Sequence, residues 1–198
     1  MIYIMRIIGI TGSSGAGKST LSEIISNMYD TYVINADELA KEMYKNGTEY
    51  YNSIVKEFGK NILAKNKEID KSKLSEKIYS NENERKILNN LTFYYLTIEI
   101  KKIIEKEKMH KIIIIDAPLL FESNLDKLCD VIIGVITEKK LQVSRICKRD
   151  NINEEKANIR LNIQKSDAFF LKNCDFIILN DKDKEYMKTQ IKSIEKII

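Results

Sequence analysis

Short runs of β-branched and other apolar residues alternate along the chain with longer stretches of helical periodicity. Residues 6–11 form a near-continuous apolar run that ends in a cluster of Gly and Ser, which is typical of a strand buried on both faces. Four later runs have a similar character, at 31–34, 111–115, 131–136 and 176–179. Strands that alternate with helices predict a five-stranded parallel sheet flanked by helices, and therefore an α/β fold.

The helical periodicity is distributed unevenly. A first helix is predicted at 19–25, and two others at 138–149 and 153–164. Between residues 38 and 108 the sequence is almost entirely amphipathic and helical, with breaks at 46–47 and around 59–69. This stretch is longer than a crossover between two strands needs, so we expect a helical lobe on the substrate side within one domain spanning 1–198.

Composition supports a folded protein without a membrane span. The chain is 43% hydrophobic and 31% charged with a formal net charge of +4, which disfavours disorder. Its apolar runs are far shorter than the roughly 20 residues that cross a bilayer. Residues 1–6 lack the basic head and long apolar stretch of a secretory signal, so we expect a cytoplasmic protein.

Cysteine usage and charge distribution exclude two further classes. Cys129, Cys147 and Cys174 are widely spaced and form no Cys-x-x-Cys pair, so we expect reduced, structural thiols rather than a disulfide framework or a zinc site. The basic residues are spread along the chain instead of forming a block, and we therefore predict no nucleic-acid partner.

A phosphate-binding loop follows the first predicted strand. Residues 12–19 match G-x-x-x-x-G-K-[ST] between a strand and a helix, the context that this motif requires. Lys18 is expected to bridge β- and γ-phosphate oxygens, and Ser19 to offer its hydroxyl to Mg²⁺. The predicted nucleotide-binding residues of the loop are Gly12, Ser13, Ser14, Gly15, Ala16, Gly17, Lys18, Ser19 and Thr20. The Asn-Lys-x-Asp motif of GTPases and the Leu-Ser-Gly-Gly-Gln motif of transporter ATPases are both missing, which leaves small-molecule kinases as the best class.

Two carboxylates follow predicted strands, and each has two interpretations. Asp37 comes directly after the second strand, where ligands gather in open parallel sheets. It suits either a general base for a substrate hydroxyl or the N-cap of the following helix. Asp116 ends a strand of four isoleucines, which is typical of a Walker-B carboxylate that organises hydrated Mg²⁺, although a cap at the strand end is the alternative.

Arginine is scarce and clustered. The chain has only five, and three of them, Arg145, Arg149 and Arg160, lie on the two helices predicted at 138–149 and 153–164. Arg145 and Arg149 are four residues apart and so share one helical face. The cluster predicts a mobile lid over about 138–166 that supplies charge stabilisation to a transferring phosphoryl group. The alternative is a solvated helix face paired with Glu138, Glu154 and Glu155.

Several blocks together resemble dephospho-coenzyme A kinases. Besides the phosphate loop, they are Asn35-Ala-Asp37, Pro118-Leu-Leu-Phe-Glu122, Gln142-x-x-Arg145-x-x-x-Arg149, Arg160-Leu-x-x-Gln164 and Cys174-Asp-Phe-Ile-Ile-x-Asn180. The resemblance implies a P-loop kinase fold and transfer of the ATP γ-phosphoryl group to the ribose 3′-hydroxyl of dephospho-CoA, giving CoA and ADP. A monomer or weak homo-oligomer is expected.

The resemblance also implies roles for individual residues. Asp37 becomes the catalytic base, acting with Lys18 and with Arg149, which lies nearest the phosphates in a lid over ATP. Arg145 and Arg160 also bind ATP, and Asn180 lies near the adenine. The helical region from about 38 to 108 holds the CoA moiety. Ser19 and Asp116 are expected to hold Mg²⁺ from the phosphate-loop and strand-end patterns described above.

Two positions depart from the family pattern. The family commonly has Asp-Ala-Asp where this chain has Asn35-Ala-Asp37, so the first carboxylate is lost. Where the family usually has a His-Pro pair, this chain has Phe93 and Tyr94. Other P-loop kinases and a non-catalytic nucleotide switch are the alternative functions. Retention of Asp37 and the three arginines argues against the switch, because a protein that only binds nucleotide needs no base.

Overall fold

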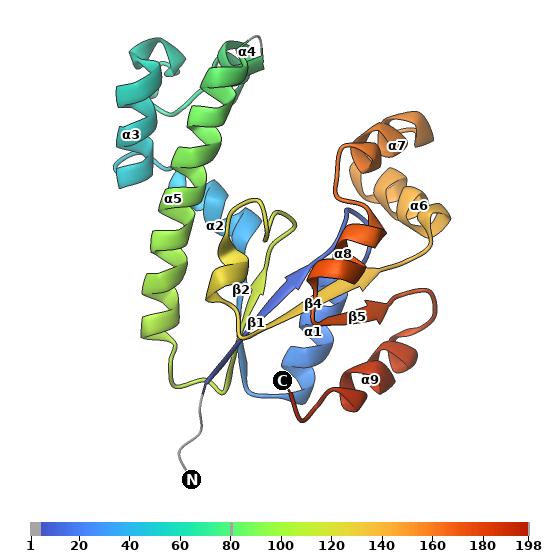
Figure 1. Cartoon of the computed structure of the whole chain (residues 1–198). Helices are drawn as coiled ribbons and strands as arrows, with labels where there is room; N and C mark the ends of the chain where they lie inside the picture. Colours follow the sequence, from blue (N-terminus) through green and yellow to red (C-terminus); the bar gives the residue numbers. More distant parts are fainter. Residues whose placement is uncertain (1–4, 80, 198) are drawn as a thin grey trace. The chain divides into compact units, whose positions relative to one another are not determined.

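A five-stranded parallel sheet forms the centre of the fold in the computed structural model, which describes residues 5–79 and 81–197 (Figure 1). The strands are β1 (Arg6–Thr11), β2 (Thr31–Asn35), β3 (Ile112–Asp116), β4 (Val131–Ile136) and β5 (Phe176–Leu179), in the order β2-β3-β1-β4-β5. The central β1 pairs with β3 on one side and β4 on the other. The predicted absence of a secretory signal concerns residues 1–6, of which 1–4 lie outside the described residues.

Alternate residues of the strands build the main core. Ile8 and Ile10 of β1 share one face of the sheet with Ile114 of β3 and Ile133 of β4, and all four are fully buried. This face packs against α1 (Lys18–Met28) and α9 (Lys184–Ser193). On the opposite face, neighbouring side chains lie close to the glycines of the sheet. A Cβ on Gly134 would lie 2.9 Å from the Sγ of Cys174.

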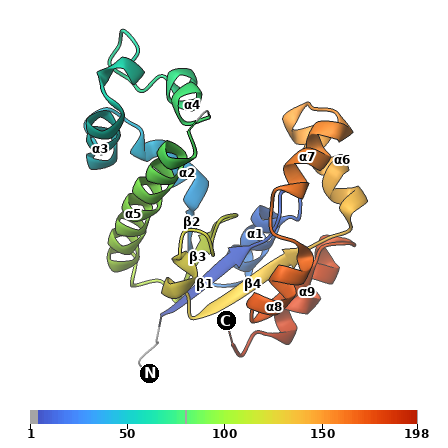
Figure 2. The same cartoon turned by 45° about the horizontal axis from the view of Figure 1, so that its top comes forward.

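The remaining helices connect these strands (Figures 1 and 2). They are α2 (Ala36–Met43), α3 (Glu49–Phe58), α4 (Lys71–Tyr79), α5 (Glu82–Lys106), α6 (Lys139–Asp150), α7 (Glu154–Asn162) and α8 (Asp167–Asn173), with short 3-10 helices η1 (Lys60–Ile62) and η2 (Leu125–Leu128). The helix α8 contacts β4 and β5. The helices α6 and α7 form a hairpin whose small core contains Val143, Ile146 and Ala157.

The chain divides into two compact units. The first comprises the described residues of Met1–Ile34 and Lys106–Ile198 and contains the phosphate loop and the α6–α7 hairpin. The second, Asn35–Glu105, contains α2 to α5. Within the second unit, hydrogen bonds of 2.7 Å between Tyr50 and Thr92 and 2.6 Å between Ser53 and Tyr95 join α3 to α5.

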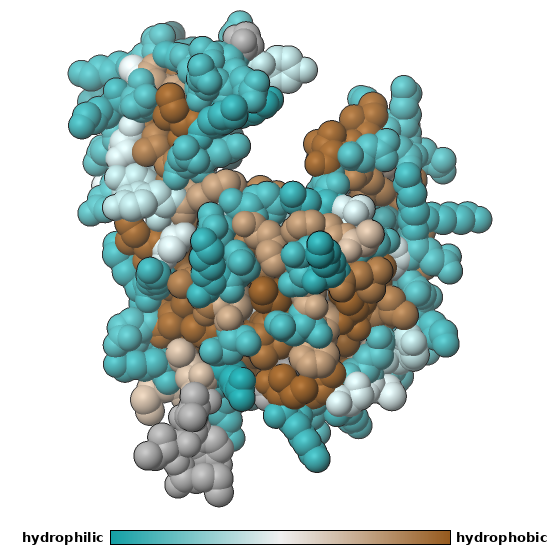
Figure 3. All heavy atoms as spheres, in the orientation of Figure 1, coloured by the Kyte–Doolittle hydropathy of each residue, from teal (hydrophilic) through white to brown (hydrophobic). Residues whose placement is uncertain are grey.

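Exposed apolar side chains lie on and next to α7. Ile159 of α7 and Ile163, its C-cap residue, are 58% and 82% exposed, and hydrophobic atoms are visible over this helix in Figure 3. In the described part of the chain, no helix is long and apolar enough to span a bilayer. The three cysteines are free thiols, as the sequence predicts.

The predicted α/β fold is confirmed, and the predicted strands agree with the structure to within one residue at each end. The helices predicted at 138–149 and 153–164 correspond to α6 and α7, although α7 ends at Asn162. The helix predicted at 19–25 is longer in the structure, where α1 spans Lys18–Met28. The sequence did not single out α8 and α9, which follow the hairpin and β5.

Candidate active site

The loop between β1 and α1 has three positions whose backbone conformation favours glycine. Gly12, Gly15 and Gly17 have φ of 143°, 76° and 106°, a region that side chains with a Cβ rarely adopt. A Cβ on Gly12 would lie 2.4 Å from the carbonyl oxygen of Val135. The spacing of glycines in the motif therefore follows from both backbone conformation and close packing against β4.

Lys18 lies within this loop at the first residue of α1. Its Nζ donates to the carbonyl oxygens of Gly12 at 2.9 Å and Ser13 at 3.3 Å. The first turn of α1 has no acidic residue, so its N-terminal partial positive charge is not offset there. A helix N-terminus combined with a lysine and a glycine-rich loop is an anion-binding arrangement.

Two glutamines hold the first serines of the loop. The buried Gln142 of α6 donates from Nε2 to Ser13 Oγ at 2.6 Å. After α7, Gln164 Oε1 accepts from the backbone N–H of Ser14 at 2.8 Å. The sequence includes both glutamines in the family-like blocks but assigns them no role. These contacts join residues that are 129 and 150 positions apart, so sequence spacing could not identify them.

Arg145 and Asn180 hold the middle of the loop. Arg145 Nη1 donates to the carbonyl oxygens of Gly15 at 3.2 Å and Ala16 at 3.4 Å. The side chain of Asn180 donates to the same oxygen of Ala16 at 2.7 Å. The structure thus places both predicted ATP-binding residues against the phosphate loop.

Arg149 and Arg160 lie elsewhere on the α6–α7 hairpin. Arg149 donates from Nε and Nη2 to the two carboxylate oxygens of Asp150, at 2.7 and 2.9 Å, and Arg160 also pairs with Asp150. The hydrogen bond from Arg149, with the charge of both arginines, lowers the pKa of Asp150 to about 2. The side chains of Arg149 and Arg160 are 57% and 45% exposed, so both can be reached from solvent. The role of Asp150 was not predicted.

Asp116 ends β3 beside α1. Its carboxylate is buried, and Oδ2 accepts from Ser22 Oγ at 3.4 Å. Ser19, in the first turn of α1, is exposed. A carboxylate and a hydroxyl are hard oxygen donors, which fit Mg²⁺. Among the described residues no group of three or more His, Cys, Asp or Glu could form a protein-only metal cage, and Mg²⁺ characteristically completes its shell with water and phosphate.

Asp37 is exposed in the first turn of α2, in the second unit. The N-cap of α2 is Asn35, whose Oδ1 accepts from the N–H of Glu38 at 3.0 Å. The alternative that Asp37 is the N-cap is therefore wrong, because α2 begins two residues earlier than the sequence indicates. Asn and Asp are about equally good caps, so the family's first carboxylate can be replaced here without loss of that role.

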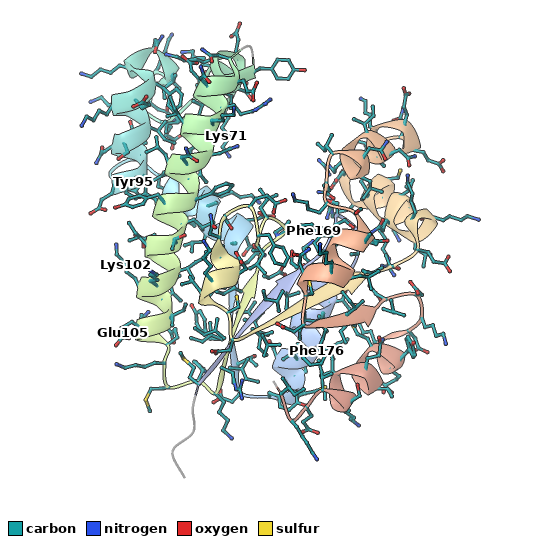
Figure 4. All side chains as sticks on the ribbon, viewed as in Figure 1. Lys71, Tyr95, Lys102, Glu105, Phe169 and Phe176 are labelled. Atoms are coloured by element: carbon teal, nitrogen blue, oxygen red, sulfur yellow. The ribbon has the colours of Figure 1, made fainter. Side chains whose placement is uncertain are left out.

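The second unit contains a cavity of about 380 Å³ between α2, α3 and α5. Tyr95 and Lys102, which project from α5 in Figure 4, contribute to its wall. The other lining residues are Leu39, Glu42, Met43, Gly47, Thr48, Glu49, Tyr50 and Glu99. Phe93 and Tyr94 are near this part of α5 in the sequence but do not line the cavity, and Tyr94 is 62% exposed.

The sequence is similar to one family over nearly its whole length. A family model described as dephospho-CoA kinase (CoaE) matches residues 6–185. A dephospho-CoA kinase of Bacillus cereus is 36% identical over 193 residues, covering 96% of each chain. One of Fusobacterium nucleatum is 37% identical over 181 residues, covering 91% of this chain and 92% of the other.

Solved structures show the same fold. A dephospho-CoA kinase of Campylobacter jejuni matches with a TM-score of 0.67 and 32% identity, covering 96% of each chain. A Thermus thermophilus protein matches with a TM-score of 0.81, 20% identity and 98% coverage of each chain. A shikimate kinase of Acinetobacter baumannii has a TM-score of 0.53 at 14% identity, covering 99% of this chain and 97% of its own, which shows likeness of fold alone.

Proposed function

The chain belongs to the dephospho-CoA kinase family, and from that premise we propose that it transfers the γ-phosphoryl group of ATP to the ribose 3′-hydroxyl of dephospho-CoA. The products are CoA and ADP. The observation that carries the proposal is the phosphate loop, whose three positive-φ glycines and Lys18 lie at the N-terminus of α1. We further propose that the enzyme works in the cytoplasm as a monomer or weak homo-oligomer.

Lys18 and the loop N–H groups bind the phosphates of ATP. Lys18 Nζ donates to the neutral carbonyl oxygens of Gly12 and Ser13 in the loop. Phosphate oxygens are stronger acceptors because they are charged. Lys18 therefore bridges the β- and γ-phosphates and stabilises the charge that develops between them during transfer.

Asp37 is the general base. It follows the carboxyl end of β2, the edge of a parallel sheet at which ligands gather, and its exposed carboxylate has no capping role. In the transfer, the oxygen of the acceptor 3′-hydroxyl forms a bond to the γ-phosphorus as the bond to the β–γ bridging oxygen breaks. The hydroxyl proton passes to Asp37, and ADP leaves with the electron pair of the broken bond.

Arg149 and Arg160 supply positive charge from the α6–α7 hairpin. Both guanidinium groups pair with Asp150, and Arg149 contacts both of its carboxylate oxygens, a geometry that phosphate oxygens reproduce. Exchange of Asp150 for phosphate oxygens would bring Arg149 to the transferring group. The arginines stabilise the transition state most when water is excluded from the site, which requires the hairpin to close over it as a lid.

Asp116 and Ser19 are the residues that we propose would hold Mg²⁺, which would neutralise the charge of the ATP phosphates. The hydrogen bond between Ser22 and Asp116 fixes the carboxylate against α1, the helix that also carries Ser19 and Lys18. The helical region over about 38–108, most of which lies in the second unit, is proposed to bind the CoA moiety.

ADP release with a panel of acceptors tests the proposed function. The purified chain is mixed with ATP, Mg²⁺ and either dephospho-CoA, adenosine, AMP or shikimate, and ADP is quantified by chromatography. Among the four acceptors, we expect rapid ADP formation only with dephospho-CoA. With that acceptor, the Lys18→Met variant should form ADP at a rate near background. Transfer to another acceptor at a higher rate would indicate a different P-loop kinase. ATP binding without transfer to any of the four would indicate a nucleotide switch.

A further inference from the structure

We infer that Arg145 and Asn180 are positioning residues that fix the peptide unit between Ala16 and Gly17, and so direct the Gly17 N–H toward the bound phosphates. This role differs from those that the family resemblance implies, which are ATP binding by Arg145 and a position of Asn180 near the adenine. The inference rests on the proposed function, because it concerns how the phosphate loop is prepared to bind ATP.

Two donors from outside the loop converge on one carbonyl oxygen. The side chain of Asn180, which follows β5, donates to Ala16 O at 2.7 Å, and Arg145 Nη1 from α6 donates to it at 3.4 Å. The same Nη1 lies 3.2 Å from Gly15 O. Ala16 is fully buried and Asn180 is 8% exposed, so these hydrogen bonds compete little with water.

Because the peptide bond is planar, the orientation of Ala16 C=O also fixes the orientation of Gly17 N–H. In a trans peptide the C=O of one residue and the N–H of the next point in opposite directions. Donors that hold Ala16 O on the outer side of the loop therefore hold Gly17 N–H on the inner side. Loop N–H groups on that side are the ones that bind the β-phosphate in motifs of this type.

The loop needs donors from outside because its glycines allow several backbone conformations. Gly15 and Gly17, with φ of 76° and 106°, flank Ala16. Glycine has no Cβ to restrict rotation of the adjoining peptide units, so the sequence that allows the loop also allows its peptides to turn over. Hydrogen bonds to Ala16 O favour one of the two orientations.

The two positioning residues are themselves fixed. The backbone oxygen of Asn180 accepts from Arg145 Nη2 at 3.2 Å and from Thr137 Oγ1 at 2.7 Å. The Asn180 side chain occupies the space beside Gly17, where a Cβ would lie 1.9 Å from Nδ2. Arg145 thus serves three carbonyl oxygens with a single guanidinium group, which the one ammonium of a lysine could not match in geometry.

Ligand binding distinguishes positioning from direct contact. Arg145→Ala, Asn180→Ala and the wild type are titrated calorimetrically with ATP, ADP and inorganic tripolyphosphate, in the presence of Mg²⁺. Lys148→Ala is the matched control, because Lys148 is an exposed cation on the same helix with no role in the site. We expect Arg145→Ala and Asn180→Ala to weaken all three ligands by the same factor, roughly 10-fold or more, and the control to change none.

The other patterns overturn the inference. Loss of ATP and tripolyphosphate affinity with ADP unchanged would mean that Arg145 contacts the γ-phosphate. Loss of ATP and ADP affinity with tripolyphosphate unchanged would mean contact with the nucleoside. Unchanged affinities for all three ligands would mean that the hydrogen bonds to Ala16 are without consequence.

Two further measurements keep the test independent of folding and of the proposed function. If circular dichroism shows that Arg145→Ala is unfolded, Arg145→Lys is expected to fold and to weaken the three ligands equally, by a smaller factor. In the wild type, we expect ADP to shift the amide resonance of Gly17, and Asn180→Ala to reduce that shift. A wild type that binds ATP but leaves dephospho-CoA unphosphorylated would contradict the proposed function alone, whereas an active wild type with unchanged variants would contradict this inference alone.

Discussion

Asn35 and Asp37 show how one residue changes the interpretation of its neighbour. The side chain of Asn35 caps α2 by accepting from the N–H of Glu38. Asp37 therefore does not cap the helix, and its carboxylate is exposed. The loss of a family carboxylate at position 35 therefore leaves both the helix start and the proposed base intact, because an amide oxygen caps a helix as well as a carboxylate does.

Asp37→Asn tests the proposed base with little change in shape. The amide keeps the size and a hydrogen-bond acceptor but cannot take a proton at neutral pH. We expect kcat to fall by about 10²- to 10⁴-fold. The melting temperature should stay near that of the wild type, because Asp37 is exposed and caps no helix.

Steady-state kinetics and a thermal melt, made on the same preparation, check this prediction. Asn35→Asp is the control, since it restores the family carboxylate at the cap and should leave kcat nearly unchanged. Wild-type turnover in a folded Asp37→Asn variant would transfer the role of base to another group.

The thiols of Cys129 and Cys174 provide a second test, based on pH. Burial raises the pKa of each thiol from 9.0 to about 12, with nearby aspartates adding to the effect. The thiolate is the reactive form, so neither residue should be alkylated by iodoacetamide near pH 8 in the native protein, whereas all three cysteines should react in urea. Mass spectrometry of the labelled peptides checks this.

The same raised pKa values set the sign of a stability change. Below about pH 9 the thiols are protonated in both the folded and the unfolded chain. As pH rises from 9 toward 12, the unfolded chain loses these protons first, and the folded state is destabilised. Native labelling of Cys174 at the rate of an unfolded peptide would contradict its burial against Gly134.

Amide and guanidinium groups of the α6–α7 hairpin donate to or accept from the phosphate loop. Gln142 and Arg145 of α6 contact Ser13, Gly15 and Ala16, and Gln164 after α7 contacts Ser14. The hairpin therefore carries two kinds of arginine. Arg145 faces the loop carbonyls, whereas Arg149 is exposed and paired with Asp150.

Arg149→Lys removes the planar guanidinium group but keeps the positive charge, so it distinguishes the effects of the two. If Arg149 braces the transferring phosphoryl group with two N–H groups at once, lysine should lower kcat appreciably while ATP affinity changes less. Lys148→Arg is the control, because residue 148 lies about 100° around the same helix and is exposed. Both substitutions conserve charge, and kcat and the Kd for ATP are measured for each. Equal, small effects would assign Arg149 to the solvated surface.

At the scale of the molecule, the sequence predicts the sheet better than it predicts the contacts around the loop. Isoleucine-rich runs such as 112–115 are long enough and apolar enough to identify buried strands, and the G-x-x-x-x-G-K-[ST] motif identifies the loop. Both signals are local. The contact of Asn180 with Ala16 joins residues 164 positions apart and depends on β5 lying next to β4, so no local pattern contains it.

The helix boundaries show the same limit. The sequence offers Asp37 as a candidate cap because Asp is a good capping residue at a helix start, but Asn35 is equally good and lies at the end of β2. Arg145 and Arg149 share a helical face by spacing, yet they have different partners, because Gly15 and Ala16 lie beside only one of them.

The central claim is that the γ-phosphoryl group of ATP is transferred to the 3′-hydroxyl of dephospho-CoA, and the position of phosphate on the product tests it most directly. The reaction is run with ATP, Mg²⁺ and dephospho-CoA, and the purified product is examined by mass spectrometry and by phosphorus–proton correlation in NMR. We predict one added phosphoryl group coupled to the ribose 3′ proton, and no such product with Lys18→Met. Phosphate at another position of the acceptor, or ADP released without a phosphorylated acceptor, would contradict it.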